Sequence, residues 1–464
     1  MPLILGTNSI KDTGFDVANS LRFDDGSSDY LNRTQGTPTN ADKYTLSVWV
    51  KRCGLTTSDY HYIASFDGGS NPREHIRFND TTDQLTWYFR DSGGTATSLT
   101  TNRLFRDVSA WYHIVCSYDS TQSTSSNRQK IYINGVQETS FSSSGYVAQN
   151  TDANLNTNSN NIKIGALGVS SPSAGFFDGY MAEVCFIDGT ALDPTSFGEF
   201  DEDSGIWKPI DVSGLTFGTN GFYLDFEDSA ALGDDVSGNG NDFTVNNLTS
   251  IDQSIDTCTN NFCTLSSLNP TQQATLSQGN LKAESSSAYK IALSTIAVSS
   301  GKWFLEHKIG SSPNLLVGVI DSQDYNSDNA INYAGENTNS VGYFSFNGKK
   351  YIANANSTYG ATYTENDIIG LALDLDSGTK TITFYKNGAS QGSINLPTAG
   401  SQEFYFLPSP YNGSIEMNFG SPPYSETGGN SDANGYGNFS MAVPSGHYCL
   451  CTKNLAEYGW YYVY

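Results

Sequence analysis

The sequence predicts an all-β protein made of two antiparallel β-sandwiches with little helix. Charged residues make up only 16% of the chain and aromatic residues 13%, and much of the remainder is Ser, Thr, Asn and Gly, with 45 glycines. This composition is typical of short strands joined by many turns. Several segments alternate with a period of two, and Asn-Gly pairs at 134–135 and 387–388 mark hairpin turns. A length of 464 residues suits two or three domains.

The first strand-rich region is predicted to form a sandwich domain over residues 1–200. Tyr44, Leu46, Val48 and Val50 recur at every second position, which places them on one face of a half-buried strand. Further strands are predicted at 85–89, 111–116, 130–136, 162–165 and 180–187.

The second strand-rich region is predicted to form another sandwich over residues 271–425. Its strands are expected at 301–309, 316–320, 341–348 and 366–388. Segments 113–135 and 368–388 both run as strand, polar acidic turn, strand and Asn-Gly, which favours two sandwiches of related topology.

Two further segments complete the predicted organisation. Residues 201–270 are expected either to connect the sandwiches or to complete the first one. Residues 426–464 are expected to form a C-terminal tail. The tail ends in an aromatic run that is expected to pack within the chain or against another subunit, namely Trp460, Tyr461, Tyr462 and Tyr464.

The charge balance of the chain argues against nucleic acid as a partner. The chain carries 24 Lys and Arg against 48 Asp and Glu, so its net charge is −24. The negative electrostatic field repels phosphate backbones, which argues against nucleic acid as a partner.

No apolar run approaches the roughly 20 residues needed to cross a bilayer, so membrane insertion is not expected. The first residues, Met1 to Gly6, lack a basic region, which favours synthesis and retention in a cytoplasm over secretion.

Enzymatic activity is not expected from the chemistry-bearing residues. Asp374 with Asp376, and Asp225 with Glu227, have the i and i+2 spacing that a glycosidase could use, but each pair precedes a turn. The five histidines form no metal-like pair, and no nucleophile elbow, P-loop or dinucleotide fingerprint is present. The seven cysteines are expected to be reduced and mostly buried.

One acidic loop has two interpretations that the sequence leaves open. Asp234, Asp235, Asn239 and Asp242 offer the oxygen ligands that calcium prefers. The same residues, with the glycines between them, also suit a solvated turn that binds no metal. Calcium is the one cofactor that the sequence indicates.

Two sets of segments resemble known domain families. Segments 20–23, 46–51, 111–115, 131–135 and above all 177–188 resemble a laminin-G-like, concanavalin A-like jelly roll. Segments 301–309 and 366–388 resemble the SPRY domain. The first resemblance implies a β-sandwich that binds glycans or proteins, often without catalysis. The second implies a β-sandwich that usually acts as a protein-interaction module, so two concanavalin A-like sandwiches are expected.

A closer resemblance involves three segments spread along the chain. Residues 1–25, 222–247 and 443–455 resemble segments of marine bacteriophage structural proteins that join a laminin-G-like to a SPRY-like domain. The resemblance implies a virion structural protein, made in the host cytoplasm, that acts as a tail or fibre component. A decoration protein on the capsid surface is one alternative. A secreted, lectin-like adhesion protein is another, disfavoured by the start of the chain and by the lack of paired cysteines.

Polar loops are the expected contact points with partners. Segments 120–127, 139–161 and 325–340 are rich in residues that hydrogen-bond adaptably. We expect them to contact a host-surface glycan or protein, or other virion proteins. Such weak contacts gain from repetition, so a homo-oligomer is expected, and a trimer would suit a fibre.

Overall fold

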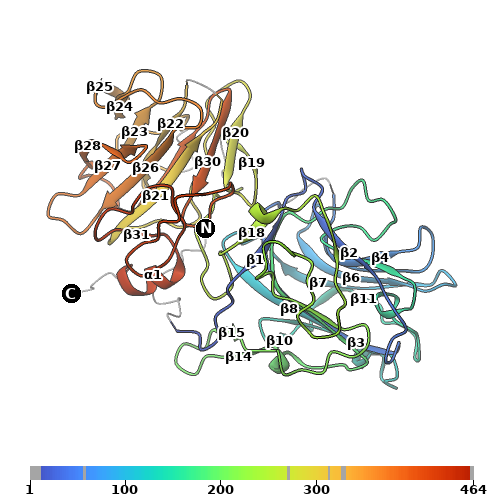
Figure 1. Cartoon of the computed structure of the whole chain (residues 1–464). Coiled ribbons are helices and arrows are strands. Elements are labelled where there is room, and N and C mark those ends of the chain that lie inside the picture. Colours follow the sequence, from blue (N-terminus) through green and yellow to red (C-terminus); the bar gives the residue numbers. More distant parts are fainter. Residues whose placement is uncertain (1–11, 56–58, 269–271, 312–313, 326–330, 460–464) are drawn as a thin grey trace. The chain divides into compact units, whose positions relative to one another are not determined.

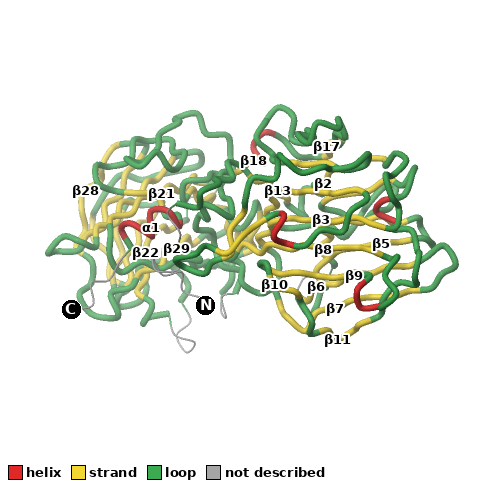
Figure 2. The backbone as a smooth tube through the Cα atoms, turned by 90° about the horizontal axis from the view of Figure 1, so that it is seen from below, coloured by secondary structure: helices red, strands yellow, loops and turns green. Residues whose placement is uncertain are grey.

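The computed structural model describes residues 12–55, 59–268, 272–311, 314–325 and 331–459. Its chain divides into two compact units, which are described separately (Figure 1). The N-terminal domain is Asp12–Thr259, and the C-terminal domain comprises the described residues from Asn260 onward. In both, nearly all of the regular secondary structure is β-strand, as predicted, and long loops join the strands (Figure 2).

Two sheets of eight strands form the N-terminal domain, and their strands pair in antiparallel fashion. In spatial order, sheet I contains β10 (Val136–Gln137), β9 (Gln129–Ile133), β8 (Trp111–Asp119), β3 (Lys43–Arg52), β13 (Gly179–Asp188), β1 (Ser20–Phe23) and β18 (Gln253–Ser254), with β16 (Phe222–Leu224) paired to β13. Sheet II contains β11 (Phe141–Ser144), β7 (Ala96–Leu104), β6 (Gln84–Arg90), β5 (Arg73–Phe78), β4 (His61–Asp67), β12 (Asn161–Ile164), β2 (Tyr30–Thr34) and β17 (Thr244–Asn246). The remaining elements are the hairpin of β14 (Gly198–Phe200) and β15 (Trp207–Pro209) and the 3-10 helices η2 (Ser125–Asn127), η3 (Asn154–Asn156), η4 (Pro194–Ser196) and η5 (Ser250–Asp252).

The core of this domain lies between the inner faces of sheets I and II. The alternation predicted for β3 is confirmed, because Tyr44, Leu46, Val48 and Val50 all lie in this core. Trp87 enters the same core from β6 of sheet II. A period of two puts one face of each strand against the other sheet, and burial of these apolar side chains stabilises the sandwich.

A buried carboxylate joins the two sheets inside this core. Glu74 on β5 accepts hydrogen bonds from Tyr44 Oη at 2.6 Å, Trp87 Nε1 at 2.9 Å and Leu155 N at 3.0 Å. Burial raises the pKa of Glu74, and these three donors offset part of that cost. Glu74 therefore links sheet I, sheet II and helix η3.

The outer face of sheet I is covered by the chain that follows β13. Phe197, Val212 and Phe217 from this covering segment pack against Val115 and Cys185 of the sheet. Much of the expected connecting segment 201–270 therefore belongs to the N-terminal domain, to which it contributes β15, β16, β17 and β18. The boundary between the two units lies at residue 259.

A large and a small sheet form the C-terminal domain. In spatial order, sheet III contains β19 (Thr275–Ser277), β20 (Lys282–Ser285), β30 (Gly413–Asn418), β21 (Lys302–Ile309), β26 (Ile368–Asp374), β27 (Thr381–Lys386) and β28 (Ala389–Asn395), and β31 (Tyr448–Cys449) pairs with β21 in parallel. Sheet IV contains β25 (Ala355–Thr358), β24 (Lys349–Ile352), β23 (Ser340–Phe344), β22 (Leu316–Asp321) and β29 (Phe404–Ser409). The core again lies between the sheets, where Trp303 and Leu371 of sheet III meet Val317 and Phe406 of sheet IV.

The two predicted Asn-Gly hairpins are confirmed. Asn134 and Gly135 connect β9 to β10 with φ angles of 48° and 78°, and Asn387 and Gly388 connect β27 to β28 with φ angles of 47° and 84°. Two successive positive φ angles are what a tight hairpin turn requires, and Asn and Gly adopt them at least cost.

The tail after residue 425 packs onto the C-terminal domain through β31 and helix α1 (Thr452–Tyr458). Leu455 of this helix enters the domain core, and the rings of Tyr448 and Tyr458 stack with centroids 3.8 Å apart. The aromatic run expected at the end, residues 460–464, lies outside the described residues.

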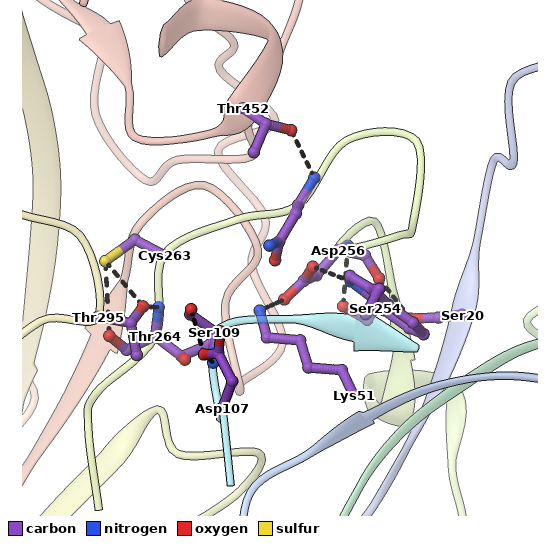
Figure 3. A network of polar contacts seen from close by, with 12 residues as sticks. Ser20, Lys51, Asp107, Ser109, Ser254, Asp256, Cys263, Thr264, Thr295 and Thr452 are labelled. Atoms are coloured by element: carbon purple, nitrogen blue, oxygen red, sulfur yellow. Dashed lines mark hydrogen bonds and ion pairs between the residues drawn. The ribbon is translucent and has the colours of Figure 1, made fainter. Parts of the chain in front are cut away.

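A buried ion pair fixes the end of the N-terminal domain to its first sheet. Lys51 Nζ on β3 lies 2.7 Å from Asp256 Oδ2, and the two side chains are 0% and 2% exposed (Figure 3). Trp111 Nε1 donates to the other oxygen of Asp256 at 3.2 Å, and Ser20 Oγ donates to its carbonyl at 2.6 Å. The segment that follows β18 is therefore held to β1, β3 and β8.

We predict that Lys51→Met lowers the free energy of unfolding of the N-terminal domain by about 3–5 kcal/mol, because it leaves the carboxylate of Asp256 buried without its cation. Urea unfolding followed by tryptophan fluorescence measures the loss. Lys43→Met is the matched control. Its partner Asp119 lies 3.3 Å away, but Lys43 is 32% exposed, so the change should cost about 1 kcal/mol or less. Equal losses in the two variants would contradict the prediction.

Another buried carboxylate, that of Glu183, makes the same domain sensitive to pH. Glu183 on β13 accepts a hydrogen bond from Tyr223 Oη at 2.7 Å. Burial, together with the charges of Asp225, Glu227 and Asp211, raises the pKa of Glu183 from 4.5 to about 7. Because the folded pKa exceeds the unfolded one, stability from this group is fully present below about pH 4.5 and is lost as the pH rises through about 7.

We predict that Glu183→Gln stabilises the domain by roughly 2–3 kcal/mol at pH 8 and changes little at pH 4.5. Glutamine keeps an acceptor for Tyr223 but cannot ionise. Urea unfolding of both proteins at the two pH values tests this. The idea fails if the difference between the two proteins is the same at both pH values.

Candidate functional site

The loop that the sequence proposed for calcium is held together by its own hydrogen bonds. Asp235 Oδ1 accepts from the backbone N–H groups of Tyr223 at 2.9 Å and Ser237 at 3.0 Å, and Asp235 Oδ2 accepts from Asn241 N at 2.8 Å. Asp242 Oδ1 accepts from Asp235 N at 3.1 Å. The carboxylate of Asp235 therefore organises the loop around the end of β16.

The other residues of this loop divide between structure and solvent. Asn239 Nδ2 donates to the carbonyls of Gly218 at 2.7 Å and Gly221 at 2.9 Å. Asp234 is exposed, and desolvation with the charge of Asp242 raises its pKa. Over the described ranges, no three His, Cys, Asp or Glu side chains are grouped so that they could hold a metal ion. Calcium binding at Asp234, Asp235, Asn239 and Asp242 stays a prediction.

One of the two carboxylate pairs considered for catalysis, Asp374 with Asp376, forms hydrogen bonds within and beside a turn. Asp374 lies 2.8 Å from Lys302 Nζ and accepts from Ser377 Oγ at 2.7 Å. Burial alone would raise the pKa of Asp374, but the hydrogen bonds from Lys302 and Ser377 outweigh it and hold the pKa at about 2. Asp376 accepts from Gly301 N at 2.7 Å. These contacts fit a structural role in the turn between β26 and β27. They also keep Asp374 ionised, whereas a general acid has to be protonated.

The most distinctive surface is a continuous row of aromatic rings on the C-terminal domain, which we name the aromatic track. In spatial order it consists of Tyr411, Tyr289, Tyr333, Tyr351, Phe344 and Phe346. Successive ring centroids lie 5.0, 5.2, 6.2, 5.8 and 6.2 Å apart. Phe346 is 63% exposed and the other five rings are half-buried. Each ring is thus held by its neighbours while part of it reaches solvent.

The topology of sheet IV explains why these rings meet. Phe344 on β23 and Tyr351 on β24 alternate with core-facing neighbours, so they project from the outer face of the sheet. The apolar residues of that face are covered by two segments, 289–293 and 331–334. These covering segments carry Tyr289 and Tyr333 to the edge of the cover, where they meet Tyr351 and Tyr411.

The ring geometry limits what the track can bind. Successive ring planes are inclined by 50°, 52°, 85°, 88° and 45°. No flat surface can therefore lie on two adjacent rings, whereas a single chain whose units turn relative to one another can contact several. The track itself contains no charged residue. Burial, with the neighbouring Tyr351, Tyr333 and Tyr411, raises the pKa of Tyr289 to about 12, so its hydroxyl is neutral at physiological pH.

The structure places the three segments predicted as contact loops in different environments. Segment 325–340 supplies Tyr333 to the track, although residues 326–330 lie outside the described part. Segment 139–161 is not one solvated loop, because it contains strand β11 and the buried helix η3. Asn154 of this helix donates to the carbonyls of Arg73 and Arg90, so a polar composition here serves internal hydrogen bonds. Segment 120–127 is held by Arg128, which donates to the carbonyls of Gln122 and Ser123.

The other track residues had no recognisable signal in the sequence. Tyr289, Tyr351 and Tyr411 are single tyrosines in three separate segments, and only the fold brings them together. The composition showed an excess of aromatic residues but not where they gather.

Family comparison identifies both domains. Residues 25–195 match the concanavalin A-like lectin/glucanases superfamily, and residues 302–422 match the SPRY domain. The chain contains a concanavalin A-like domain and a SPRY domain. Both are binding folds that are generally not enzymatic, which favours a binding or adhesion role. Five of the six track residues lie within the SPRY match, and Tyr289 precedes it in the same compact unit.

Several solved structures are similar to parts of the chain. A human SPRY domain is 20% identical, covers 32% of this chain and 92% of its own, and has a TM-score of 0.24. The SPRY domain of human HERC1 is 20% identical, with 28% and 83% covered and a TM-score of 0.24. Stonustoxin is 20% identical, with 34% and 27% covered and a TM-score of 0.26. No curated protein sequence matches the chain.

Among the helices of the described ranges, none has both the length and the apolar character that crossing a bilayer requires.

We predict that Asp235→Ala lowers the free energy of unfolding of the concanavalin A-like domain by about 2–4 kcal/mol, because three backbone N–H groups lose a charged acceptor. Thermal unfolding in the presence of a chelator measures this. Asp234→Ala is the control, since that exposed side chain should change stability by about 0.5 kcal/mol or less.

Calcium addition to the chelated protein decides between the two interpretations of the loop. A rise in Tm with calcium, lost in Asp242→Asn, would support a calcium site. An unchanged Tm, with no heat of binding in calorimetry, would leave the loop as a turn alone.

Proposed function

We propose that the protein is a bacteriophage virion component, on the tail or a fibre, that binds host-surface glycans or neighbouring virion proteins through the aromatic track. The single observation that carries the binding proposal is the row of six partly exposed rings on the C-terminal domain. Exposed aromatic rings in a contiguous patch are costly in water, and such patches mark interaction sites.

The chemistry of the track favours an uncharged glycan chain as its ligand. Aromatic rings present flat apolar faces to the C–H groups of a sugar, while tyrosine hydroxyls donate and accept hydrogen bonds with its hydroxyl groups. Tyr333 Oη already donates to Asn354 Oδ1 at 2.7 Å, so an amide lies beside the rings as a further polar contact. The inclined rings suit a single twisted chain.

The location on a phage particle rests on sequence resemblance. Residues 1–25, 222–247 and 443–455 resemble segments of marine phage structural proteins with the same two domain types. The same resemblance carries synthesis in the host cytoplasm and assembly with other virion proteins. A symmetric oligomer, such as a trimer, would repeat the track and turn weak single contacts into firm attachment.

We predict that replacing Tyr289 and Tyr333 together by Ala weakens binding to bacterial cells or neutral polysaccharides at least about tenfold, because central aromatic residues dominate such contacts. Binding of the purified full chain to a panel of neutral polysaccharides and intact bacteria measures this. Tyr385→Ala is the matched control. Tyr385 is a half-buried tyrosine on β27. Ile382 and Phe384 of the same strand face the core, so Tyr385 lies on the outer face of sheet III.

Each part of the proposal has its own contrary result. If the double variant binds as the unchanged protein does while both remain folded, the track is not the binding surface. If mass spectrometry of purified particles does not detect the protein, the virion assignment fails, and a secreted adhesion protein or a non-phage role takes its place.

A further inference from the structure

A second, chemically different cluster lies on the outer face of sheet II in the concanavalin A-like domain. Along β5, Ile76 and Phe78 face the core, so Arg77 between them projects from the opposite face. Tyr62 lies opposite Arg77 on β4, and Tyr88 lies opposite His75 on β6. We name the set of Tyr60, Tyr62, His75, Arg77 and Tyr88 the Arg77 cluster.

Aromatic rings surround the guanidinium of Arg77. Its central carbon lies 3.7 Å from the ring centroid of Tyr60, 5.5 Å from that of Tyr62 and 5.8 Å from that of Tyr88. Arg77 Nη1 donates to Tyr62 Oη at 2.9 Å. The ring of His75 stacks on Tyr88 with centroids 5.6 Å apart and lies edge-on to Tyr62 at 5.2 Å. The cluster therefore orients a half-buried cation through ring contacts.

Among the described residues Arg77 has no acidic partner, although the chain has twice as many acidic as basic residues. In the described part of the chain it takes part in no ion pair, and its hydrogen bond to Tyr62 uses one of five donor hydrogens. Some other arginines of this domain do have acidic partners: Arg73 lies 3.1 Å from Asp67, and Arg52 lies 3.2 Å from Asp83. A guanidinium held by rings with donors left over is prepared for an incoming anion.

The nearby carboxylates do not supply that anion. Asp67 is engaged by Arg73 at 3.1 Å and by His75 at 3.5 Å. Asp59 accepts from the backbone N–H groups of Tyr60 at 2.8 Å and Gly175 at 2.7 Å. The anion that fits Arg77 has to come from outside these contacts.

We propose that the Arg77 cluster binds a terminal acidic sugar of a glycan, with the sugar carboxylate on the guanidinium of Arg77 and the sugar ring against the half-buried rings of Tyr60 and Tyr88. Arginine and a carboxylate match in planar, two-hydrogen-bond geometry. The flanking rings add the apolar contact that a sugar face offers and a simple anion lacks. This site is separate from the aromatic track in residues, domain and ligand charge.

The charge of the protein favours an isolated acidic group over a polyanion. A net charge of −24 repels densely charged polymers, and the cluster offers one arginine without an acidic partner. A terminal acidic sugar brings a single carboxylate on an otherwise neutral chain. An acidic peptide brings several, and it lacks the sugar face that the rings can pack against.

The test uses the full chain on a biosensor with four immobilised probes: a disaccharide ending in glucuronic acid, the same disaccharide ending in glucose, one ending in glucose 6-sulfate, and a pentaglutamate peptide. We expect the glucuronate probe to bind at least about tenfold more tightly than the neutral one, which is the contribution of one charge-assisted hydrogen-bonded pair. Because this comparison uses the unchanged protein, it does not depend on any variant folding.

Variants then place the preference at Arg77. Arg77→Gln should remove the preference for glucuronate, and Arg77→Lys should keep only part of it, because lysine lacks the planar fork. Arg103→Gln is the control. This substitution removes the same charge, but from a side chain that is 51% exposed and paired with Glu138. Melting curves confirm that each variant is folded.

Any one of five results would overturn the proposal, the first four of which concern the pattern of binding. These are equal binding of the neutral probe, tighter binding of the sulfate probe, binding of the peptide as tight as that of the glucuronate probe, and an unchanged preference in folded Arg77→Gln. Absence of binding to every probe at millimolar concentration also overturns it. The track has its own test, which uses the Tyr289 and Tyr333 double variant with neutral polysaccharides and intact bacteria.

Discussion

A two-layer sandwich buries only one face of each sheet, and both candidate surfaces depend on how the outer faces are treated. In the concanavalin A-like domain, the chain after β13 covers the outer face of sheet I with Phe197, Val212 and Phe217. Sheet II carries polar and aromatic side chains on its outer face instead, among them Arg77 and Tyr88. In the SPRY domain, the cover over sheet IV is partial and ends in tyrosines. Covering apolar surface therefore decides where rings and donors remain in reach of solvent.

Buried carboxylates fix the chain segments that cover or close the sheets. Asp188 at the end of β13 accepts from Asn156 Nδ2 at 2.6 Å, Thr39 N at 2.7 Å and Asn220 N at 3.0 Å, and these donors come from three distant segments. In the SPRY domain, Glu306 accepts from Ser440 N at 3.0 Å and so holds the tail. A buried charge without donors is costly, so each such carboxylate favours the one arrangement of segments that satisfies it. Apolar packing gives these domains their stability, and the buried carboxylates add definition to the loop positions.

The sequence predicts local structure well and distant contacts poorly, for a physical reason. The alternation of Tyr44, Leu46 and Val48 and the turn at Asn134 depend on neighbours within a few residues, and both predictions are confirmed. The aromatic track and the Arg77 cluster depend on which strands pair, which no local pattern records. The acidic loop stays ambiguous because a carboxylate such as that of Asp235 can accept backbone hydrogens or bind a metal, and both uses favour the same residue types. Segment 139–161 misled for the same reason, since Asn154 uses its polar atoms inside the fold.

As proposed, the two candidate surfaces would recognise their ligands by direct contact, and this would suit a strongly acidic protein. The long-range field of the net charge extends about 10 Å at 0.1 M salt and only about 3 Å at 1 M, so in salty water it contributes little to attraction or to exclusion. Contacts between rings and sugar faces do not depend on that field. The Arg77 guanidinium would act at hydrogen-bond distance from within a ring cluster. Because it is partly buried there, salt screens its charge less than the charge of an exposed cation. At low salt the acidic surface would hold polyanions away from Arg77, and at high salt the geometry of the ring cluster would have to provide the discrimination alone. On these proposals, specificity would rest on shape and ring placement, and net charge would be a secondary factor.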